Sequence, residues 1–281
     1  MTIKYIDLFA GVGGFRVGIN KAHPNWECVY SNEYDKYANS VYKKHYERCD
    51  DRDIRTVKTE EIPDHDLLVG GFPCQAFSVA GKRRGFEDTR GTLFFEIARI
   101  AKQKQPRLLL LENVKGLLSH DSGNTFKTIL RSLDELGYDC QWQVLNSKDF
   151  GVPQNRERVF IIGHLRGTSR PEVFPIRGSN SNHLEEITKG VSDAQRIYST
   201  KQAKSLKGLG GGLGAKTGLY KIDNLKIRRL TPVECERLQG FPDNWTKYGH
   251  DDKEMSDTQR YKMMGNAVTT TVVTSIVRKL I

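Results

Sequence analysis

The stretch that decides the fold is IKYIDLFAGVGGF, Ile3–Phe15, which passes from an apolar strand pattern through a glycine-rich turn into a helical pattern. In doubly wound sheets, ligands bind at the carboxyl ends of the strands, where glycines let the backbone approach the ligand. Arg16 stands where the dinucleotide fingerprint G-x-G-x-x-G has its last glycine. The stretch therefore favours a nucleoside without phosphates over a pyrophosphate.

The same alternation of apolar runs and amphipathic stretches continues to about Gly163. Fully apolar runs such as Leu108–Leu111 are typical of strands covered on both faces. Strands are predicted over Ile3–Phe9, Glu27–Ser31, Asp66–Val69, Leu108–Leu111 and Val159–Gly163, and helices over Gly14–Ala22, Tyr37–His45, Thr92–Lys104 and Asn124–Leu136. The sequence thus predicts an α/β fold with a doubly wound, mainly parallel sheet.

Two acidic residues support a nucleoside site beside the glycine-rich turn. Glu33 follows the second strand at the distance where an acidic residue normally binds ribose hydroxyls. Asp53 and Ile54 are predicted to contact the adenine from the end of a third strand. S-adenosylmethionine is a nucleoside of this kind. The alternative, a glycine-rich turn without a ligand, is weakened by these two carboxylates at successive strand ends.

The sequence argues against a membrane protein, a secreted protein and a fold held together by disulfides or a structural metal. The longest apolar run, Leu108–Leu111, is far short of the roughly 20 residues that a bilayer requires. The first residues, MTIKYIDLFAG, lack the organisation of a secretion signal, so we expect a cytoplasmic protein. The five cysteines are scattered without a Cys-x-x-Cys motif, and we expect neither disulfides nor a structural metal.

The basic charge is concentrated in one region. The chain carries a net charge of +10, and Leu165–Leu230 holds 13 Lys or Arg against 5 Asp or Glu. This region is also glycine-rich and weakly periodic, which suits a nucleic-acid surface. A solvated insertion between core elements is the alternative that charge alone would favour.

The end of the chain is predicted to be helical. Thr231, Pro232 and Glu234 form a capping box that begins a helix ending before Gly240. From Ala267 to Leu280, Val and Thr favour a strand, but apolar residues recur every fourth position, and we predict a helix that returns to the first domain.

Three polar groups follow strands of the predicted sheet. Cys74 comes after Gly-Phe-Pro in a loop, Glu112 directly follows four leucines, and Arg156 and Arg158 precede the strand at Val159. Alone, the cysteine is more simply a buried, inert residue, and the Gln154–Arg158 segment an ordinary surface ion-pair cluster. Together, a thiol, a carboxylate and arginines at one sheet edge predict an active site with a cysteine nucleophile.

These motifs resemble the bacterial cytosine-C5 DNA methyltransferases of restriction-modification systems. The matching segments, in the family's order from Asp7 to Val268, are DLFAGVGGF, GFPCQAFS, ENV, QNRERVF, RRLTPVECERLQGFPDNW and MGNAV. GFPCQ with ENV and QNRER is a highly specific combination. The small GCGC-type enzymes share further segments, GFEDTRGTLFF, RIYST and AKTG.

The resemblance implies a chemistry for each polar group. Cys74 would add to C6 of a flipped-out cytosine, Glu112 would bind N3 and the exocyclic amine, and Arg158 would hold O2. Arg156 would support the loop or a phosphate. The methyl group would pass from S-adenosylmethionine to C5, with no metal. The partner would be double-stranded DNA, and the protein a monomer without direct contact to any cognate restriction endonuclease.

The resemblance also implies the binding residues. Those for the cofactor are Phe9, Gly11, Gly13, Glu33, Tyr34, Asp53, Ile54, Pro73, Leu93, Asn266 and Val268. Those for DNA are Gln75, Ser78, Ala80, Lys82, Arg83, Arg90, Arg196, Tyr198, Lys207, Leu209, Gly210 and Gly211. Ser78–Arg90 would form a mobile loop that closes over DNA. Arg196 is the leading base reader, with a phosphate clamp as its rival role.

The implied domains are 1–170 for catalysis and cofactor binding, completed by a C-terminal helix at 266–281, a small loop-rich target-recognition domain at 171–227, and a connecting segment at 228–265. The recognition domain departs from the family because Arg177–Val191 replaces a longer stretch. Ala80 stands where related enzymes use a polar side chain to fill the gap left by the flipped base. Ser192 and Asp193 are alternative candidates for that role.

Three rival functions remain at this point. A nicotinamide or flavin oxidoreductase would explain the glycine turn and Glu33 but leaves Cys74, Glu112 and Arg158 without a role. A DNA-binding module without catalysis is opposed by the same side chains. A tRNA-cytosine methyltransferase shares them, and the basic glycine-rich region favours DNA only modestly.

Overall fold

A computed structural model gives the structure of the chain, and it describes residues 2–73, 93–177, 197–198, 202–208, 216–221 and 227–281. Its centre is a six-stranded sheet in the order β2-β1-β3-β4-β7-β5. The strands are β1 (Lys4–Leu8), β2 (Glu27–Asn32), β3 (Leu67–Gly71), β4 (Leu108–Val114), β5 (Tyr138–Asn146) and β7 (Glu157–Leu165). Strands β1 to β4 pair in parallel, and β7 runs antiparallel to both β4 and β5. The prediction of a mainly parallel sheet is confirmed.

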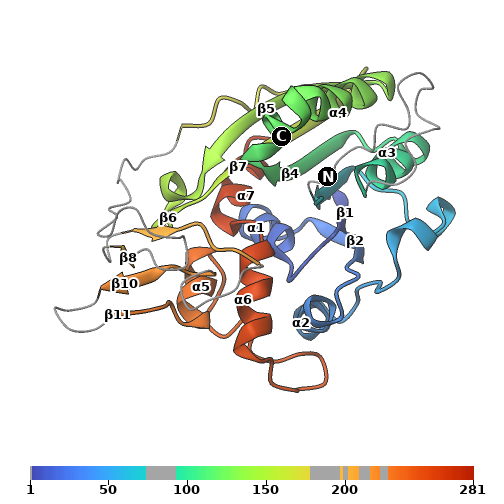
Figure 1. Cartoon of the computed structure of the whole chain (residues 1–281). Coiled ribbons are helices and arrows are strands. Elements are labelled where there is room, and N and C mark those ends of the chain that lie inside the picture. The colour runs from blue at the N-terminus through green and yellow to red at the C-terminus, as the bar shows by residue number, and fades with distance from the viewer. Residues whose placement is uncertain (1, 74–92, 178–196, 199–201, 209–215, 222–226) are drawn as a thin grey trace.

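Helices cover both faces of this sheet, as Figure 1 shows. Helices α3 (Leu93–Lys104) and α4 (Asn124–Glu135) pack on one face through a cluster that includes Phe94 and Ile129. Helices α1 (Gly14–Ala22) and α7 (Thr270–Val277) pack on the other, around Ile19 and Val273. The returning C-terminal helix is thereby confirmed, although it begins at Thr270. In the part of the chain that the structure describes, no helix is both long and apolar enough to cross a membrane.

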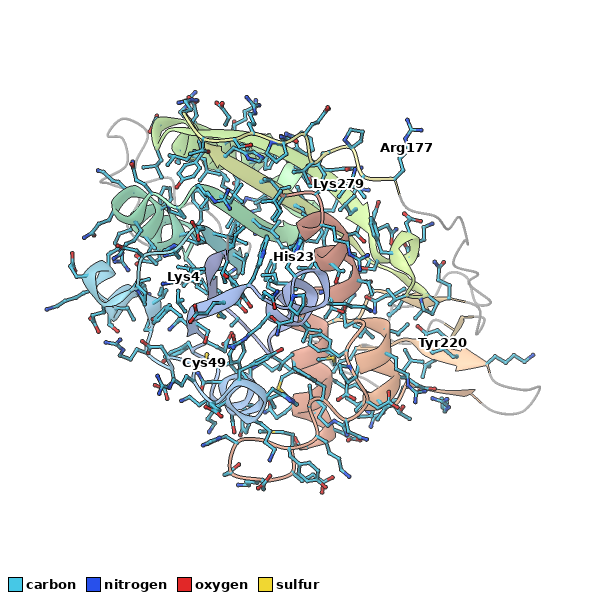
Figure 2. All side chains as sticks on the ribbon, turned by 180° about the vertical axis from the view of Figure 1, so that it is seen from behind. Lys4, His23, Cys49, Arg177, Tyr220 and Lys279 are labelled. Carbon is cyan, nitrogen blue, oxygen red and sulfur yellow. The ribbon has the colours of Figure 1, made fainter. Side chains whose placement is uncertain are left out.

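A smaller layer of structure lies beside the sheet (Figure 1). It contains the short strands β8 (Ile197–Tyr198), β10 (Leu219–Lys221) and β11 (Ile227–Arg228), and β9 (Ala203–Lys204), which pairs with β6 (Gln154–Asn155). Tyr220, labelled in Figure 2, joins these strands: its hydroxyl accepts from Lys204 N and donates to Thr217 O. Helices α2 (Lys36–Tyr46), α5 (Pro232–Leu238) and α6 (Asp257–Asn266) share a third apolar cluster with this layer.

The bounds of two predicted strands need correction, and two elements were missed. Strand β7 begins at Glu157, so Arg158 lies inside this strand instead of before it. Strand β4 extends to Val114, so Glu112 lies inside a strand and pairs with Gly71 and Phe160 instead of following the strand. The apolar run ends at Leu111, but hydrogen bonding to both neighbours continues beyond it. Strand β5 and helix α6 were not predicted, because both are mostly polar or half-buried and lack a clear apolar period. The capping box of α5, with Thr231 and Glu234, is as predicted.

A buried carboxylate lies at the end of β1. Asp7 is 0% exposed, and neither of its oxygens has a hydrogen-bond partner among the described residues. Burial raises the pKa of Asp7 to about 8, against the opposing effect of Arg16 and with a smaller contribution from Glu33. Because the pKa is higher in the folded than in the unfolded chain, folding loses stability as the pH rises from about 4 to about 8.

We expect Asp7→Asn to remove this pH dependence. Relative to the variant, the wild type should lose roughly 4 kcal/mol of stability between pH ~5 and pH ~8, about 1.4 kcal/mol for each pH unit. Urea unfolding at several pH values measures it. Asp64→Asn, at an exposed position paired with Lys104, is the control and should not show the same trend. A pH-independent difference for Asp7→Asn would contradict the unpaired burial of Asp7.

Candidate active site

The turn after β1 bends sharply towards the neighbouring strand. Phe9, Gly11 and Gly13 have positive φ angles of 55°, 56° and 88°. Gly11 and Gly13 adopt this left-handed region at little cost, whereas Phe9 is strained there. The turn is fixed by a hydrogen bond from Ala10 N to Asn32 O, 3.0 Å. This brings the glycine-rich segment against the end of β2.

Glu33 follows β2 and is held by backbone donors. Its Oε2 accepts from Gly11 N at 2.8 Å, and its Oε1 accepts from Asp35 N at 2.7 Å. Burial raises the pKa of Glu33, while these two N–H groups oppose the shift. The carboxylate is therefore fixed in place beside the glycine turn, with lone pairs left for a ligand.

A cavity of about 510 Å³ opens at the carboxyl ends of these strands. Its walls include most of the predicted site residues that the structure describes. They are Phe9, Gly11, Glu33, Tyr34, Asp53, Ile54, Pro73, Leu93, Asn266, Glu112, Arg156 and Arg158. A cavity of this volume is in the range of small-molecule sites. The structure thus brings together residues from both ends of the chain.

Three predicted cofactor residues are placed differently from expectation. Asp53 does not follow a strand: it caps the 3-10 helix η1 (Ile54–Thr56), well before β3, and forms an ion pair with Arg55 at 2.5 Å. Gly13 and Val268 are absent from the cavity wall. Gly13 precedes α1, and Val268 packs so close to Gly14 that a Cβ there would lie 2.7 Å from Val268 Cγ1. Gly13 and Val268 therefore contribute to the shape of the turn without lining the cavity.

The carboxylate and arginine that were predicted as catalytic form a buried ion pair in the same cavity. Arg158 Nε lies 3.0 Å from Glu112 Oε1, with side chains 16% and 12% exposed. They face each other because β4 and β7 pair antiparallel, with Val114 opposite Arg158. Burial raises the pKa of Glu112, against the lowering effect of Arg158 and then Arg156. Glu112 is therefore a carboxyl group that takes up a proton more readily than an exposed glutamate.

The segment before Cys74 is hydrogen-bonded to the strand that carries Glu112. Asn113 Nδ2 donates to Phe72 O at 2.8 Å, which joins β4 to the end of β3. Pro73 lines the cavity and is the residue next to Cys74. Cys74 itself lies outside the described residues, as do Gln75, Ser78, Ala80, Lys82, Arg83 and Arg90 of the predicted closing loop.

Of the two roles predicted for Arg156, support of a loop or of a phosphate, its contacts favour support of the backbone. It is 2% exposed and donates to three backbone carbonyls, Leu206 O, Gly265 O and Ala267 O, at 2.8–3.0 Å. Its guanidinium is thus occupied by backbone carbonyls, and binding a DNA phosphate would break these bonds. Burial and then Arg158 lower the pKa of Arg156 to about 9, which leaves it charged at neutral pH.

The predicted DNA-reading residues are only partly described. Arg196, Leu209, Gly210 and Gly211, and the alternative candidates Ser192 and Asp193, lie outside the described residues. Tyr198 lies in β8, and Lys207 N donates to Lys216 O at 3.0 Å.

One ion pair at the cavity was not predicted. Lys262 of α6 lies 2.5 Å from Asp35, whose carboxylate also caps α2, and both residues line the cavity. They are 227 positions apart, and no sequence pattern connects them. Within the described ranges, no group of three or more His, Cys, Asp or Glu side chains is arranged to hold a metal ion.

Comparison with known proteins gives a consistent result. The family described as C-5 cytosine-specific DNA methylase matches residues 3–208 and 186–281. The chain is 40% identical to the Type II methyltransferase M.HhaI of Haemophilus parahaemolyticus, over 96% of this chain and 92% of that protein. It is 41% identical to M1.ScrFI of Lactococcus lactis subsp. cremoris, over 100% and 79%.

Among solved structures, the S. pombe Dnmt2 methyltransferase matches with a TM-score of 0.76 at 19% identity, covering 100% of this chain and 98% of that one. At this identity the likeness concerns the fold, and it agrees with the layered sheet described above. The family match and the identity to the Type II enzymes span the whole chain. The protein therefore belongs to the C-5 cytosine-specific DNA methylase family and is a DNA (cytosine-5-)-methyltransferase.

Proposed function

We propose that Cys74 is the covalent nucleophile, and that Glu112 and Arg158 hold the target cytosine. The observation that carries this proposal is the buried pair of Glu112 and Arg158 in the same cavity as Pro73, the residue before Cys74. A carboxyl group with a raised pKa can hydrogen-bond to N3 and the exocyclic amine of a cytosine, and a fixed guanidinium beside it can donate to O2.

The other end of the cavity suits S-adenosylmethionine. Glu33, held by two backbone N–H groups, would bind ribose hydroxyls, and Phe9, Ile54 and Leu93 offer apolar surface for an adenine. A Cβ built on Gly11 would meet no atom within 4 Å, so the backbone there is open to a ligand. When bound, S-adenosylmethionine supplies a methyl group that carries the electrophilic character of a sulfonium.

The protein's own groups prepare the cytosine. The Cys74 thiolate adds to C6, and the electron pair of the C5–C6 bond shifts towards N3 and O2. Glu112 donates a proton or hydrogen bond at N3, and Arg158 steadies O2, so the developing negative charge is neutralised. C5 becomes nucleophilic and accepts the methyl group, with S-adenosylhomocysteine as the leaving group. Loss of the C5 proton to a base then releases the thiolate and restores the aromatic ring, and the proton on N3 returns to Glu112.

The base must leave the duplex for this chemistry, at a cost of a few kcal/mol. We assign DNA binding to the closing loop Ser78–Arg90 and to the basic region 171–227, which we take as the recognition domain, with 228–265 as the connection. The relatives named above are Type II methyltransferases. On that basis we propose a sequence-specific enzyme of a restriction-modification system, acting as a monomer in the cytoplasm.

The rival functions are less consistent with these findings. A nicotinamide or flavin oxidoreductase belongs to other families, and its cofactor would leave the Glu112–Arg158 pair without a role. A module without catalysis would not need a carboxyl group buried beside Arg158. Burying an ion pair carries a desolvation penalty that the attraction between the two charges often does not recover.

The experiment that tests the proposal is incubation of the protein with labelled S-adenosylmethionine and unmethylated duplex DNA, followed by base-resolution mapping of 5-methylcytosine. We expect methyl groups on C5 of cytosines within one short sequence. Methylation of RNA alone, or at N4, would contradict the proposal. Methylation of cytosines in every context would retain the chemistry but contradict sequence specificity.

A further inference from the structure

Arg156 is a buried cation whose hydrogen bonds all go to neutral groups. Within the described chain, its Nη1 donates to Leu206 O at 3.0 Å and to Ser205 Oγ at 3.4 Å, and its Nη2 donates to Gly265 O at 3.0 Å and Ala267 O at 2.8 Å. Its position is between β6 and β7, one residue from Glu157 and two from Arg158. Burying a charge without a hydrogen-bonded carboxylate is costly, so this arrangement calls for an explanation beyond packing.

The two ends of the guanidinium serve different parts of the protein. Nη1 holds segment 202–208, which contains Lys207 and directly precedes Leu209–Gly211 in the sequence, all of them predicted to bind DNA. Nη2 holds the C-terminal end of α6, Gly265–Ala267, which forms part of the cavity wall. One rigid, planar group therefore joins the predicted DNA-reading segment to the predicted cofactor site. Lysine has no such fork and cannot hold both ends in one plane.

Close packing reinforces this junction. A Cβ built on Gly265 would collide with Gly208 N and Lys207 C, and one built on Gly208 would collide with the Asn266 side chain. The backbone of Gly265 thus lies directly against the backbone of Lys207 and Gly208, and the Asn266 side chain lies against Gly208. A shift of segment 202–208 is transmitted directly to Asn266, since neither glycine leaves room to absorb it.

We propose that Arg156 is a positioning residue that couples DNA binding at segment 202–208 to cofactor binding at the end of α6, residues 265–267. Each ligand then stabilises the arrangement that the other requires, and their affinities rise together, as linkage demands. The inference rests on the proposed cofactor cavity and recognition segment. Arg156 touches no reacting atom in this account, in contrast to Arg158.

The test measures the dissociation constant of S-adenosylhomocysteine by titration calorimetry, with and without saturating unmethylated plasmid DNA. For the wild type we expect the ratio of the two constants to lie between about 5 and 150, the usual range of coupling between sites. For Arg156→Lys the ratio should fall close to one. Because no reacting atom loses a contact, kcat/KM should fall more than kcat at saturation.

Arg260→Lys is the matched control. Arg260 is also buried, on α6, but it binds Glu236 at 3.0 Å and Thr246 at 3.2 Å and makes no hydrogen bond to segment 202–208. It should lower thermal stability and keep the wild-type ratio. Gly208→Ala is a second variant, which displaces the Asn266 side chain from segment 202–208 without altering Arg156, and it should also lower the ratio.

The outcomes separate the inference from the proposed function. A wild-type ratio of one, an unchanged ratio in both Arg156→Lys and Gly208→Ala, or an equal loss in Arg260→Lys would overturn the coupling while methylation persisted. If Arg156→Lys did not fold, the ratio measured for Gly208→Ala would decide whether the two sites are coupled. Failure of the wild type to bind S-adenosylhomocysteine at all would instead overturn the proposed cofactor cavity on which the inference rests.

Discussion

Cys74→Ala is expected to abolish methylation of cytosine C5, with a fall in kcat of roughly 10⁴-fold or more, because the other groups of an active site achieve little once the nucleophile is removed. Labelled methyl transfer to unmethylated plasmid DNA measures the rate. The affinity for S-adenosylhomocysteine should change by less than about threefold, under 1 kcal/mol, since no predicted cofactor contact is lost.

Cys140→Ala is the control for this substitution. Cys140 is half-buried on β5, at the far edge of the sheet from β1, and burial raises the pKa of its thiol to about 12. Its removal should leave the methylation rate unchanged. Methyl transfer to C5 by Cys74→Ala at a rate near that of the wild type would show that Cys74 is not the nucleophile.

Glu112→Gln is expected to lower kcat by about 10²- to 10⁴-fold, the usual contribution of a positioned general acid. Glutamine keeps the shape of the side chain and a hydrogen bond, but it cannot give a proton to N3. Burial raises the pKa of Glu112, so its protonated form persists to higher pH than in an exposed glutamate. The decline of wild-type kcat as pH rises through that pKa should therefore be absent from the variant.

Glu157→Gln is the matched control for Glu112→Gln. Glu157 begins β7 and pairs with Lys115 at 2.9 Å on the surface, with its side chain 43% exposed. An exposed ion pair contributes about 0–1 kcal/mol to stability, and this one does not line the cavity, so kcat and its pH profile should be retained. Equal losses in both variants, or a wild-type pH profile in Glu112→Gln, would show that Glu112 does not supply the proton.

The fold could be predicted where apolar periodicity was strong. The glycine turn, strands β1 to β4 and helices α1 to α4 carry clear periods of the strand or helix type, and each lies within a few residues of its predicted bounds. Strand β5 was missed because its residues are mostly half-buried. It lies at the sheet edge, where Gln141 and Gln143 donate to Pro171 O and Ile176 O. Because polar side chains of β5 make these contacts, the sequence of the strand shows no apolar periodicity.

The site could be predicted as far as it depends on strand ends. Glu33, Glu112 and Arg158 meet in one cavity because their strands end or pair at the same edge. The environment of Arg156 could not be predicted, since it depends on backbone carbonyls supplied by residues 50 to 111 positions away. The Lys262–Asp35 pair likewise depends on how the C-terminal helices return to the sheet. Contacts between residues so far apart in the sequence leave no local sequence pattern.

The most direct test of the central claim is trapping of the covalent intermediate. A methylatable duplex that carries 5-fluorocytosine at the mapped site is incubated with the protein and S-adenosylmethionine, and the adduct is located by peptide mass spectrometry. Because fluorine at C5 cannot leave as a proton does, we expect a stable DNA adduct on Cys74. An adduct on another residue, or none from a preparation that methylates the unmodified duplex, would contradict it.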